Sequence, residues 1–148
     1  MDEPLTDLPA ATHTPLSVAL IDDHGLCRQG LAELLQLRAG MRVVGSAGNP
    51  TDALALLHRE TPDLLVMDLR MPAMDGLTLL GKLRAEGIET PVVILTMSDS
   101  PDDLAEALRA GVRGYLLKDM EPEDVMRSIA RCGQGELVIA PAMAGKLS

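Results

Sequence analysis

The sequence of 148 residues predicts an α/β protein with a doubly wound, five-stranded parallel sheet and helices on both faces of that sheet. Short apolar runs alternate along the chain with longer segments in which apolar residues recur at helical spacing. The apolar runs lack polar alternation, as in LLVM at residues 64–67, which is typical of strands covered on both faces. Regular alternation of strand and helix implies right-handed crossovers and therefore parallel strands.

The first half of the chain contains two strand–helix units. Residues 17–21 (SVALI) form an apolar, partly β-branched run and are expected to be a strand. Leucines at helical spacing predict a helix over residues 26–37. A second strand is expected over residues 41–47, followed by a helix over residues 51–60 with a capping Asn or Thr at its start.

The second half contains three further units of the same kind. Each has a continuous apolar run, then a helical pattern that begins or ends near a Pro or Gly. The expected strands and helices are residues 64–68 and 77–86, residues 91–96 and 102–110, and residues 114–117 and 121–132.

The composition argues against several classes of protein. The net charge of −9 disfavours nucleic-acid binding by this chain itself, because a phosphate backbone is bound by a basic face. No apolar run is long enough to span a membrane, and the acidic residues 1–15 do not resemble a signal peptide. We therefore expect a cytoplasmic protein with no membrane contact and a disordered leader over residues 1–15. Cys27 and Cys132 follow no metal-ligand pattern and are expected to be free, buried thiols.

Polar side chains follow most of the expected strands at the point where each strand ends. They are Asp22 and Asp23 after the first strand, Asp68 at the end of the third, Thr96 at the end of the fourth and Lys118 after the fifth. Ligands of open parallel sheets bind at the carboxyl ends of the strands. We therefore expect these side chains to converge at one site.

Three carboxylates at one site repel one another. Two unit charges about 4 Å apart cost about 4 kcal/mol at an effective dielectric of about 20, and one lysine offsets only part of this. Either one carboxylate stays protonated or a hard cation binds, and oxygen ligands with room for water favour Mg²⁺. Mg²⁺ held in this way usually serves a phosphoryl group, which Lys118 and the Thr96 hydroxyl are suited to bind. Asp68 can then act as the nucleophile that forms an aspartyl phosphate.

Each of these residues also has a purely structural interpretation. Asp22 and Asp23 could cap the first helix, and Asp68 could be a solvated strand end. Thr96 could be an ordinary turn residue and Lys118 an ordinary surface lysine. Their joint occurrence at strand ends of one α/β pattern favours a phosphoryl site over these separate interpretations.

Three stretches of the sequence carry a resemblance to a known family: IDDHGLCRQGL at residues 21–31, MDLRMPAMDGL at 67–77 and GYLLKDMEPEDV at 114–125. They resemble the receiver domain of two-component response regulators. Within it they are most similar to the NarL/FixJ branch with LuxR-type helix-turn-helix output domains, and there to the nitrate/nitrite regulators. The resemblance covers residues 16–139 and implies a flavodoxin-like (βα)5 fold.

The resemblance also implies a domain organisation. The receiver domain would cover residues 16–135. Residues 136–148 would be the start of a linker to a C-terminal output domain that is absent from this chain; the alternative is a receiver that works alone. DNA would then be bound only through that output domain, and phosphorylation would promote a homodimer.

The resemblance further implies a role for each matching residue. Asp68 would accept a phosphoryl group from a sensor histidine kinase. Asp23, Asp68 and the backbone carbonyl of Arg70 would ligate Mg²⁺ directly, with Asp22 acting mainly through water. Lys118 would pair with the phosphoryl group.

Two residues would carry the switch in such a domain. Thr96 would hydrogen-bond the phosphoryl group and shift towards it, and Tyr115 would then change its rotamer behind Thr96. The surface formed by the last two helices and the last strand would differ between the two states. One departure from the family is His24-Gly25, where His-Pro is common, and we expect this difference to touch no proposed metal ligand.

Other functions remain as alternatives. A Mg²⁺-dependent aspartyl-phosphate phosphatase or phosphotransferase would typically carry a second Asp two residues after the nucleophile, where this chain has Arg70. A nucleotide-binding module would need a Gly-rich loop after the first strand, where the chain has DDHG. A pseudo-receiver that acts only through protein contacts would be expected to lack one of the five site residues. We therefore expect self-phosphorylation and dephosphorylation but no other enzymatic activity.

Overall fold

The computed structural model describes residues 14–147, and within this range six parallel strands form one sheet in the order β2-β1-β3-β4-β5-β6. The strands are β1 (Ser17–Ile21), β2 (Arg42–Ala47), β3 (Leu64–Met67), β4 (Val92–Thr96), β5 (Gly114–Leu117) and β6 (Val138–Ile139). The strand order reverses between β1 and β3, because β2 lies on one side of β1 and all later strands lie on the other.

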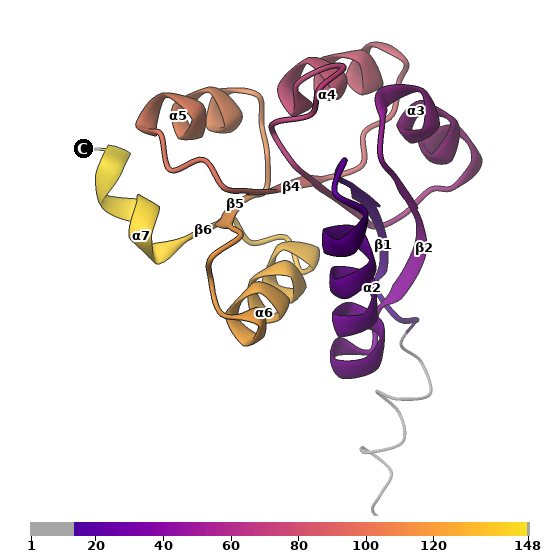
Figure 1. Ribbon diagram of the computed structural model, residues 1–148, viewed down its shortest axis with the longest axis horizontal. Coiled ribbons are helices and arrows are strands. Elements are labelled where there is room, and N and C mark those ends of the chain that lie inside the picture. Colours follow the sequence, from indigo (N-terminus) through magenta and orange to yellow (C-terminus); the bar gives the residue numbers. More distant parts are fainter. Residues whose placement is uncertain (1–13, 148) are drawn as a thin grey trace, which may run out of the picture.

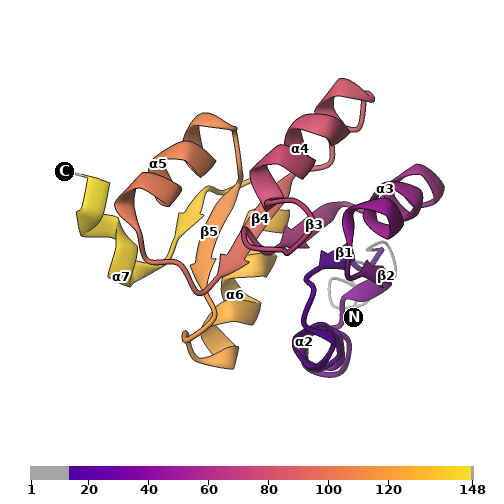
Figure 2. The ribbon, with the colours of Figure 1, turned by 45° about the horizontal axis from the view of Figure 1, so that its top comes forward.

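Helices cover both faces of the sheet. They are α2 (Gly25–Ala39), α3 (Pro50–Arg59), α4 (Gly76–Ala85), α5 (Pro101–Arg109), α6 (Pro122–Gly133) and the short α7 (Pro141–Ala144), followed by the 3₁₀ turn η1 (Gly145–Leu147). Figure 1 shows α2 and α6 on one face of the sheet and α3, α4 and α5 on the other. Figure 2 shows the strands running between these two layers, with α7 beyond the β6 edge.

Two apolar cores lie on the two faces of the sheet. One includes Ile94 and Tyr115 and contains the buried residues of α3, α4 and α5. The other includes Val93 and contains the buried residues of α2 and α6. Successive residues of β4 thus point into different cores, and all five residues of that strand are buried. This explains why the central strands show no polar alternation.

The starts of α3, α4 and α5 are fixed by their capping residues. Asn49, Asp75 and Ser100 each accept a hydrogen bond from the backbone N–H three residues later. These caps satisfy N–H groups that the first helical turn leaves unpaired. They therefore define where each loop from the carboxyl end of a strand turns into a helix.

The predicted α/β fold is confirmed, and each of the five expected strand–helix units is present with bounds that differ by at most two residues. The predicted number of strands was wrong, because Val138 and Ile139 pair with Gly114 and Tyr115 as a sixth strand. A strand of two residues is too short to show a periodic pattern in the sequence. Val138 and Ile139 are extended because the edge of β5 offers backbone groups that would otherwise lack partners.

Two further expectations concern single segments. The expected leader over residues 1–15 falls almost wholly outside the described residues. Both cysteines are free, and Cys132 is buried as predicted, but the prediction for Cys27 was wrong because it is only half-buried on α2. Between residues 14 and 147, no helix combines the length and apolar character needed to cross a membrane.

Candidate functional site

The reversal of strand order places the end of β1 beside the end of β3. The backbone N–H of Asp68 donates to the carbonyl of Ile21 at 3.0 Å, and the N–H of Asp22 donates to the carbonyl of Ala47 at 3.1 Å. Both aspartates therefore continue the hydrogen-bond ladder just beyond their strands. The sheet itself fixes their backbones at the edge where ligands of open α/β sheets bind.

Lys118 contacts both of these carboxylates. Its Nζ lies 2.6 Å from Oδ2 of Asp22 and 3.0 Å from Oδ2 of Asp68. The three side chains are at most 12% exposed, so water screens these contacts little. Lys118 reaches this position because its backbone N–H donates to the carbonyl of Thr96 at 2.9 Å, which ties the ends of β4 and β5 together.

These contacts shift the pKa values of the partners. Burial alone would raise the pKa of Asp22, but hydrogen bonds from Lys118 and His24 outweigh it and hold that pKa below its usual value. Burial would lower the pKa of Lys118, but the carboxylates of Asp22 and Asp68 outweigh it and raise that pKa above its usual value. Asp22 and Lys118 are therefore both charged at neutral pH.

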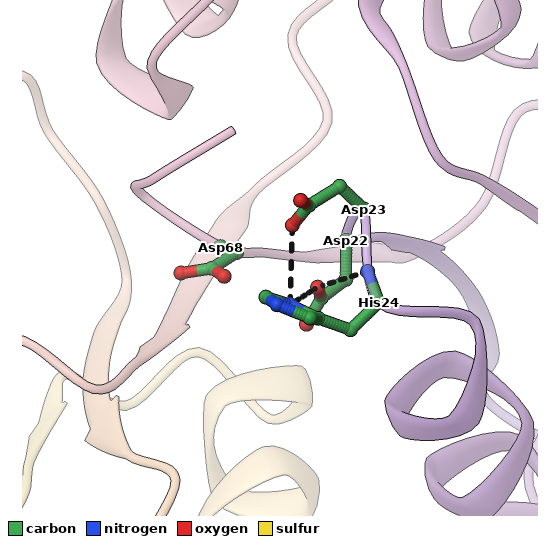
Figure 3. A group of neighbouring side chains, drawn as sticks. All are labelled: Asp22, Asp23, His24 and Asp68. Carbon is green, nitrogen blue, oxygen red and sulfur yellow. Dashed lines mark hydrogen bonds and ion pairs between the residues drawn. The ribbon is translucent and has the colours of Figure 1, made fainter. Parts of the chain in front are cut away.

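Figure 3 shows Asp22, Asp23 and His24 together at the start of α2, beside Asp68 at the end of β3. Nδ1 of His24 lies 3.1 Å from Oδ1 of Asp22 and 3.1 Å from Oδ1 of Asp23. The expectation that the His24-Gly25 pair touches no proposed ligand was therefore wrong. His24 is also the N-cap of α2 and makes no side-chain cap, so neither Asp22 nor Asp23 occupies the capping position.

The residues at this edge fit a divalent cation. One possible ligand atom from each of Asp22, Asp23, His24 and Asp68 lies within 4.8 Å of the others. Oδ1 of Asp23 is buried and accepts no hydrogen bond from the described residues, although His24 lies within ion-pair distance. A buried carboxylate oxygen without a hydrogen bond is unusual and is available to a metal. Carboxylate oxygens suit a hard cation such as Mg²⁺. Sequence reasoning missed His24 as a neighbour of this site, although His24 directly follows Asp22 and Asp23 in the sequence.

Thr96 and Tyr115 lie on the neighbouring strands. Thr96 is buried at the end of β4, and its hydroxyl accepts a hydrogen bond from the N–H of Ser98 at 3.2 Å. Tyr115 is fully buried on β5, and its phenol donates to the carbonyl of Ser98 at 2.9 Å. Burial raises the pKa of Tyr115 above its usual value. Ser98 thus connects the two residues for which the switch role is predicted.

Gly76 supports the backbone of Asp68 from the start of α4. Its N–H donates to the carbonyl of Leu69 at 2.7 Å. A Cβ atom at this position would lie 2.4 Å from the carbonyl oxygen of Asp68 and 3.2 Å from Cα of Leu69. Only glycine allows the helix to approach the loop after Asp68 this closely.

The structure thus brings Asp22, Asp68 and Lys118 into direct contact, with Asp23 beside them. Thr96 is linked to Lys118 through the backbone. The role of the Arg70 carbonyl stays a prediction. The Arg70 side chain instead pairs with Asp103 on α5, a residue that sequence reasoning missed because nothing in the sequence separates it from the adjacent Asp102.

Residues 18–130 match the family described as the response regulator receiver domain. The nitrate/nitrite response regulator protein NarL of Escherichia coli (strain K12) is 39% identical over 129 residues, which cover 87% of this chain and 60% of that protein. The chain therefore spans about 60% of the length of this relative.

Solved structures show the same fold. The isolated receiver domain of RcsB from Salmonella enterica serovar Typhimurium, determined with the phosphomimetic BeF3−, is 25% identical with a TM-score of 0.82, and the match covers 91% of this chain and 100% of that one. The receiver domain of the putative response regulator NarL from Mycobacterium tuberculosis is 32% identical with a TM-score of 0.77, and the match covers 84% of this chain and 100% of that one.

Proposed function

The chain belongs to the response regulator receiver domain family, and we propose on this basis that it is a phosphorylation switch in which Asp68 accepts a phosphoryl group from a sensor histidine kinase in the presence of Mg²⁺. The observation that carries this proposal is the contact of Lys118 with Asp68, 3.0 Å long, at the end of a buried strand. A fixed carboxylate beside a fixed ammonium group is an arrangement that suits an acyl-phosphate acceptor.

The chemical step follows from this arrangement. An oxygen of the Asp68 carboxylate attacks phosphorus, the bond from phosphorus to the imidazole nitrogen of the kinase histidine breaks, and the electron pair leaves with the imidazole. Lys118 compensates the charge on the phosphoryl oxygens. Asp23, Asp68 and the Arg70 carbonyl, with Asp22 acting mainly through water, would hold Mg²⁺, which would supply further charge compensation for the same oxygens.

The switch follows from the charge of the new group. A phosphoryl group adds about −1.5 to −2 charges and new acceptor oxygens, by analogy with phosphoserine. The Thr96 hydroxyl, which now accepts from Ser98, turns to donate to a phosphoryl oxygen. The Ser98 loop then moves, and with it the carbonyl that holds the Tyr115 phenol. The surface formed by α5, β5 and α6 reports the change to partners.

The proposal extends to the domain organisation and the partners. We propose that residues 16–135 act as the receiver domain and that residues 136–148 lead to an output domain. DNA is bound through that output domain, and phosphorylation promotes a homodimer in the cytoplasm. In support, RcsB, a structural relative, has been solved as dimers bound to DNA. The relatives that match this chain are response regulators rather than enzymes, and Arg70 stands where an aspartyl phosphatase would carry its acid.

Intact mass spectrometry tests the acceptor. The chain is incubated with Mg²⁺ and acetyl phosphate beside the variants Asp68→Asn and Asp102→Asn, the second of which changes an exposed acid on α5. We expect one labile phosphoryl adduct on the wild type and on Asp102→Asn, none on Asp68→Asn, and none without Mg²⁺. An adduct that persists in Asp68→Asn would refute Asp68 as the acceptor, and continuous phosphate release over many turnovers would instead favour a phosphatase.

A further inference from the structure

Asp103 bridges two loops that flank the acidic site. Its Oδ2 accepts hydrogen bonds from a guanidinium nitrogen of Arg70 and from the hydroxyl of Ser98, each at 2.5 Å. Arg70 lies two residues after Asp68, and Ser98 lies two residues after Thr96. One carboxylate on α5 therefore holds the loop of the acceptor and the loop of the switch threonine together.

Asp103 is itself held in place. It stands in the first turn of α5, and its backbone N–H donates to the hydroxyl of the capping Ser100 at 3.4 Å. Its side chain is 14% exposed, whereas that of Arg70 is 63% exposed. Because the acid is fixed by a helix and the arginine is not, the acid determines where the guanidinium lies.

The carboxylates of the acidic site also attract the guanidinium of Arg70. The backbone N–H of Arg70 lies 3.4 Å from Oδ1 of Asp68, so its side chain starts at the acidic site. Asp22, Asp23 and Asp68 carry more negative charge than Lys118 compensates. An unrestrained guanidinium would therefore pair with these carboxylates, for which arginine has suitable geometry.

We propose that Asp103 is a positioning residue that holds the Arg70 guanidinium away from the carboxylates and so keeps them free for a divalent cation. Without this restraint Arg70 competes with the cation for the same oxygens. The consequence for phosphorylation rests on the proposed function, because slower phosphoryl acceptance is expected only if Asp68 is the acceptor. The consequence for cation binding does not need any phosphoryl transfer.

Calorimetric titration with Mg²⁺ directly tests the predicted effect of Asp103 on cation binding. We expect Asp103→Asn to weaken Mg²⁺ binding at least threefold relative to the wild type. The matched control is Asp102→Asn, which removes the same charge from the same helical turn at an exposed position, and we expect less than a twofold change. A thermal melt of each variant confirms that it is folded.

A double-mutant cycle shows whether the effect passes through Arg70. In an Arg70→Ala background, Asp103→Asn is expected to change the Mg²⁺ affinity less than twofold. Ser98→Ala removes the other hydrogen bond to Asp103 and is expected to leave the affinity unchanged. The proposal is overturned if Asp103→Asn has no effect, if the effect persists without Arg70, or if Ser98→Ala reproduces it. Should Asp103→Asn not fold, Asp103→Ser replaces it in the same cycle.

A second readout separates this proposal from the proposed function. The rate of adduct formation with acetyl phosphate is measured at a Mg²⁺ concentration near the wild-type Kd. We expect a slower rate in Asp103→Asn that rises to the wild-type rate at saturating Mg²⁺. If the wild type binds Mg²⁺ but forms no adduct, the proposed function fails while the titration still decides the role of Asp103. If the wild type binds no Mg²⁺, the positioning role of Asp103 is refuted.

Discussion

Nζ of Lys118 lies closer to Asp22, at 2.6 Å, than to Asp68, at 3.0 Å. The lysine therefore compensates the proposed metal-binding carboxylate at least as much as the proposed acceptor. It acts as an internal counter-ion at a site where acids outnumber bases. A cation that binds Asp22 would take over this task and leave Lys118 free for the phosphoryl oxygens.

Replacement of Lys118 tests its role as a counter-ion. Lys118→Met leaves Asp22 and Asp68 facing each other without a cation, and we expect the free energy of unfolding to fall by about 1–3 kcal/mol without Mg²⁺. Added Mg²⁺ should restore up to about 2.7 kcal/mol at a concentration 100 times its Kd. Urea denaturation with and without Mg²⁺ measures both effects. Lys82→Met, at an exposed position of α4, is the control and should change stability little; equal stability of the two variants would argue against the counter-ion role.

The close approach of α4 to the backbone of Asp68 predicts opposite effects for two glycines of that helix. Gly76→Ala places a methyl group 2.4 Å from the carbonyl oxygen of Asp68 and should destabilise the protein by about 1–3 kcal/mol. Gly81→Ala has open space and should stabilise it by about 0.5–1 kcal/mol. Chemical denaturation gives both values. A Gly76→Ala variant of unchanged stability would mean that α4 does not confine the backbone of Asp68.

Tyr115 offers an intrinsic probe of the switch, because it is the only aromatic residue of the chain. Its phenol donates to the carbonyl of Ser98, and the N–H of Ser98 donates to Thr96. Phosphorylation that moves Thr96 should therefore change the intensity of tyrosine fluorescence. We expect the change with acetyl phosphate and Mg²⁺ in the wild type, a smaller change in Thr96→Ala and none in Asp68→Asn. An adduct on Asp68 without any change in emission would separate phosphorylation from movement of the tyrosine.

Burial of Cys132 predicts a loss of stability at alkaline pH. Burial raises the pKa of its thiol from 9.0 to about 11, so the folded protein binds a proton that the unfolded chain releases at lower pH. This contribution is fully present below pH 9.0 and is lost as the pH rises towards about 11. Denaturant unfolding from pH 8 to about 11 should show the decline, and Cys132→Ala should make it shallower. An identical decline in Cys132→Ala would assign it to other groups, such as Tyr115, whose pKa is also raised by burial.

The sequence alone determined the order and type of the elements. The runs that became β1, β3, β4 and β5 could be predicted because each strand is buried on both faces, so nearly all of its residues are apolar, with polar Ser17 and Thr96 only at strand ends. The start of each of the five expected helices was predicted to within one residue, with Asn49 or Thr51 as the start signal of α3 and Pro122 as that of α6. The convergence of the polar residues at the strand ends could also be predicted, since parallel strands bring their carboxyl ends to one edge of the sheet. Strand β6 could not be predicted from the sequence, because its two residues are too few to show a periodic pattern and are extended only where β5 offers an edge.

Only the tertiary structure decided which of these polar atoms meet. Adjacency in sequence showed that His24 follows Asp22 and Asp23, but the path of the chain into α2 set its ring between both carboxylates. The bridge from Asp103 to Arg70 spans 33 residues, and Asp102 would have fitted the sequence equally well. Leu104 and Ala107 of α5 are buried against the sheet, and this fixes the rotation of the helix about its axis. Asp103 therefore lies on the partly buried side of α5 and Asp102 on the exposed side. Local patterns thus determine the elements, whereas side-chain partners depend on how packing rotates each element about its axis.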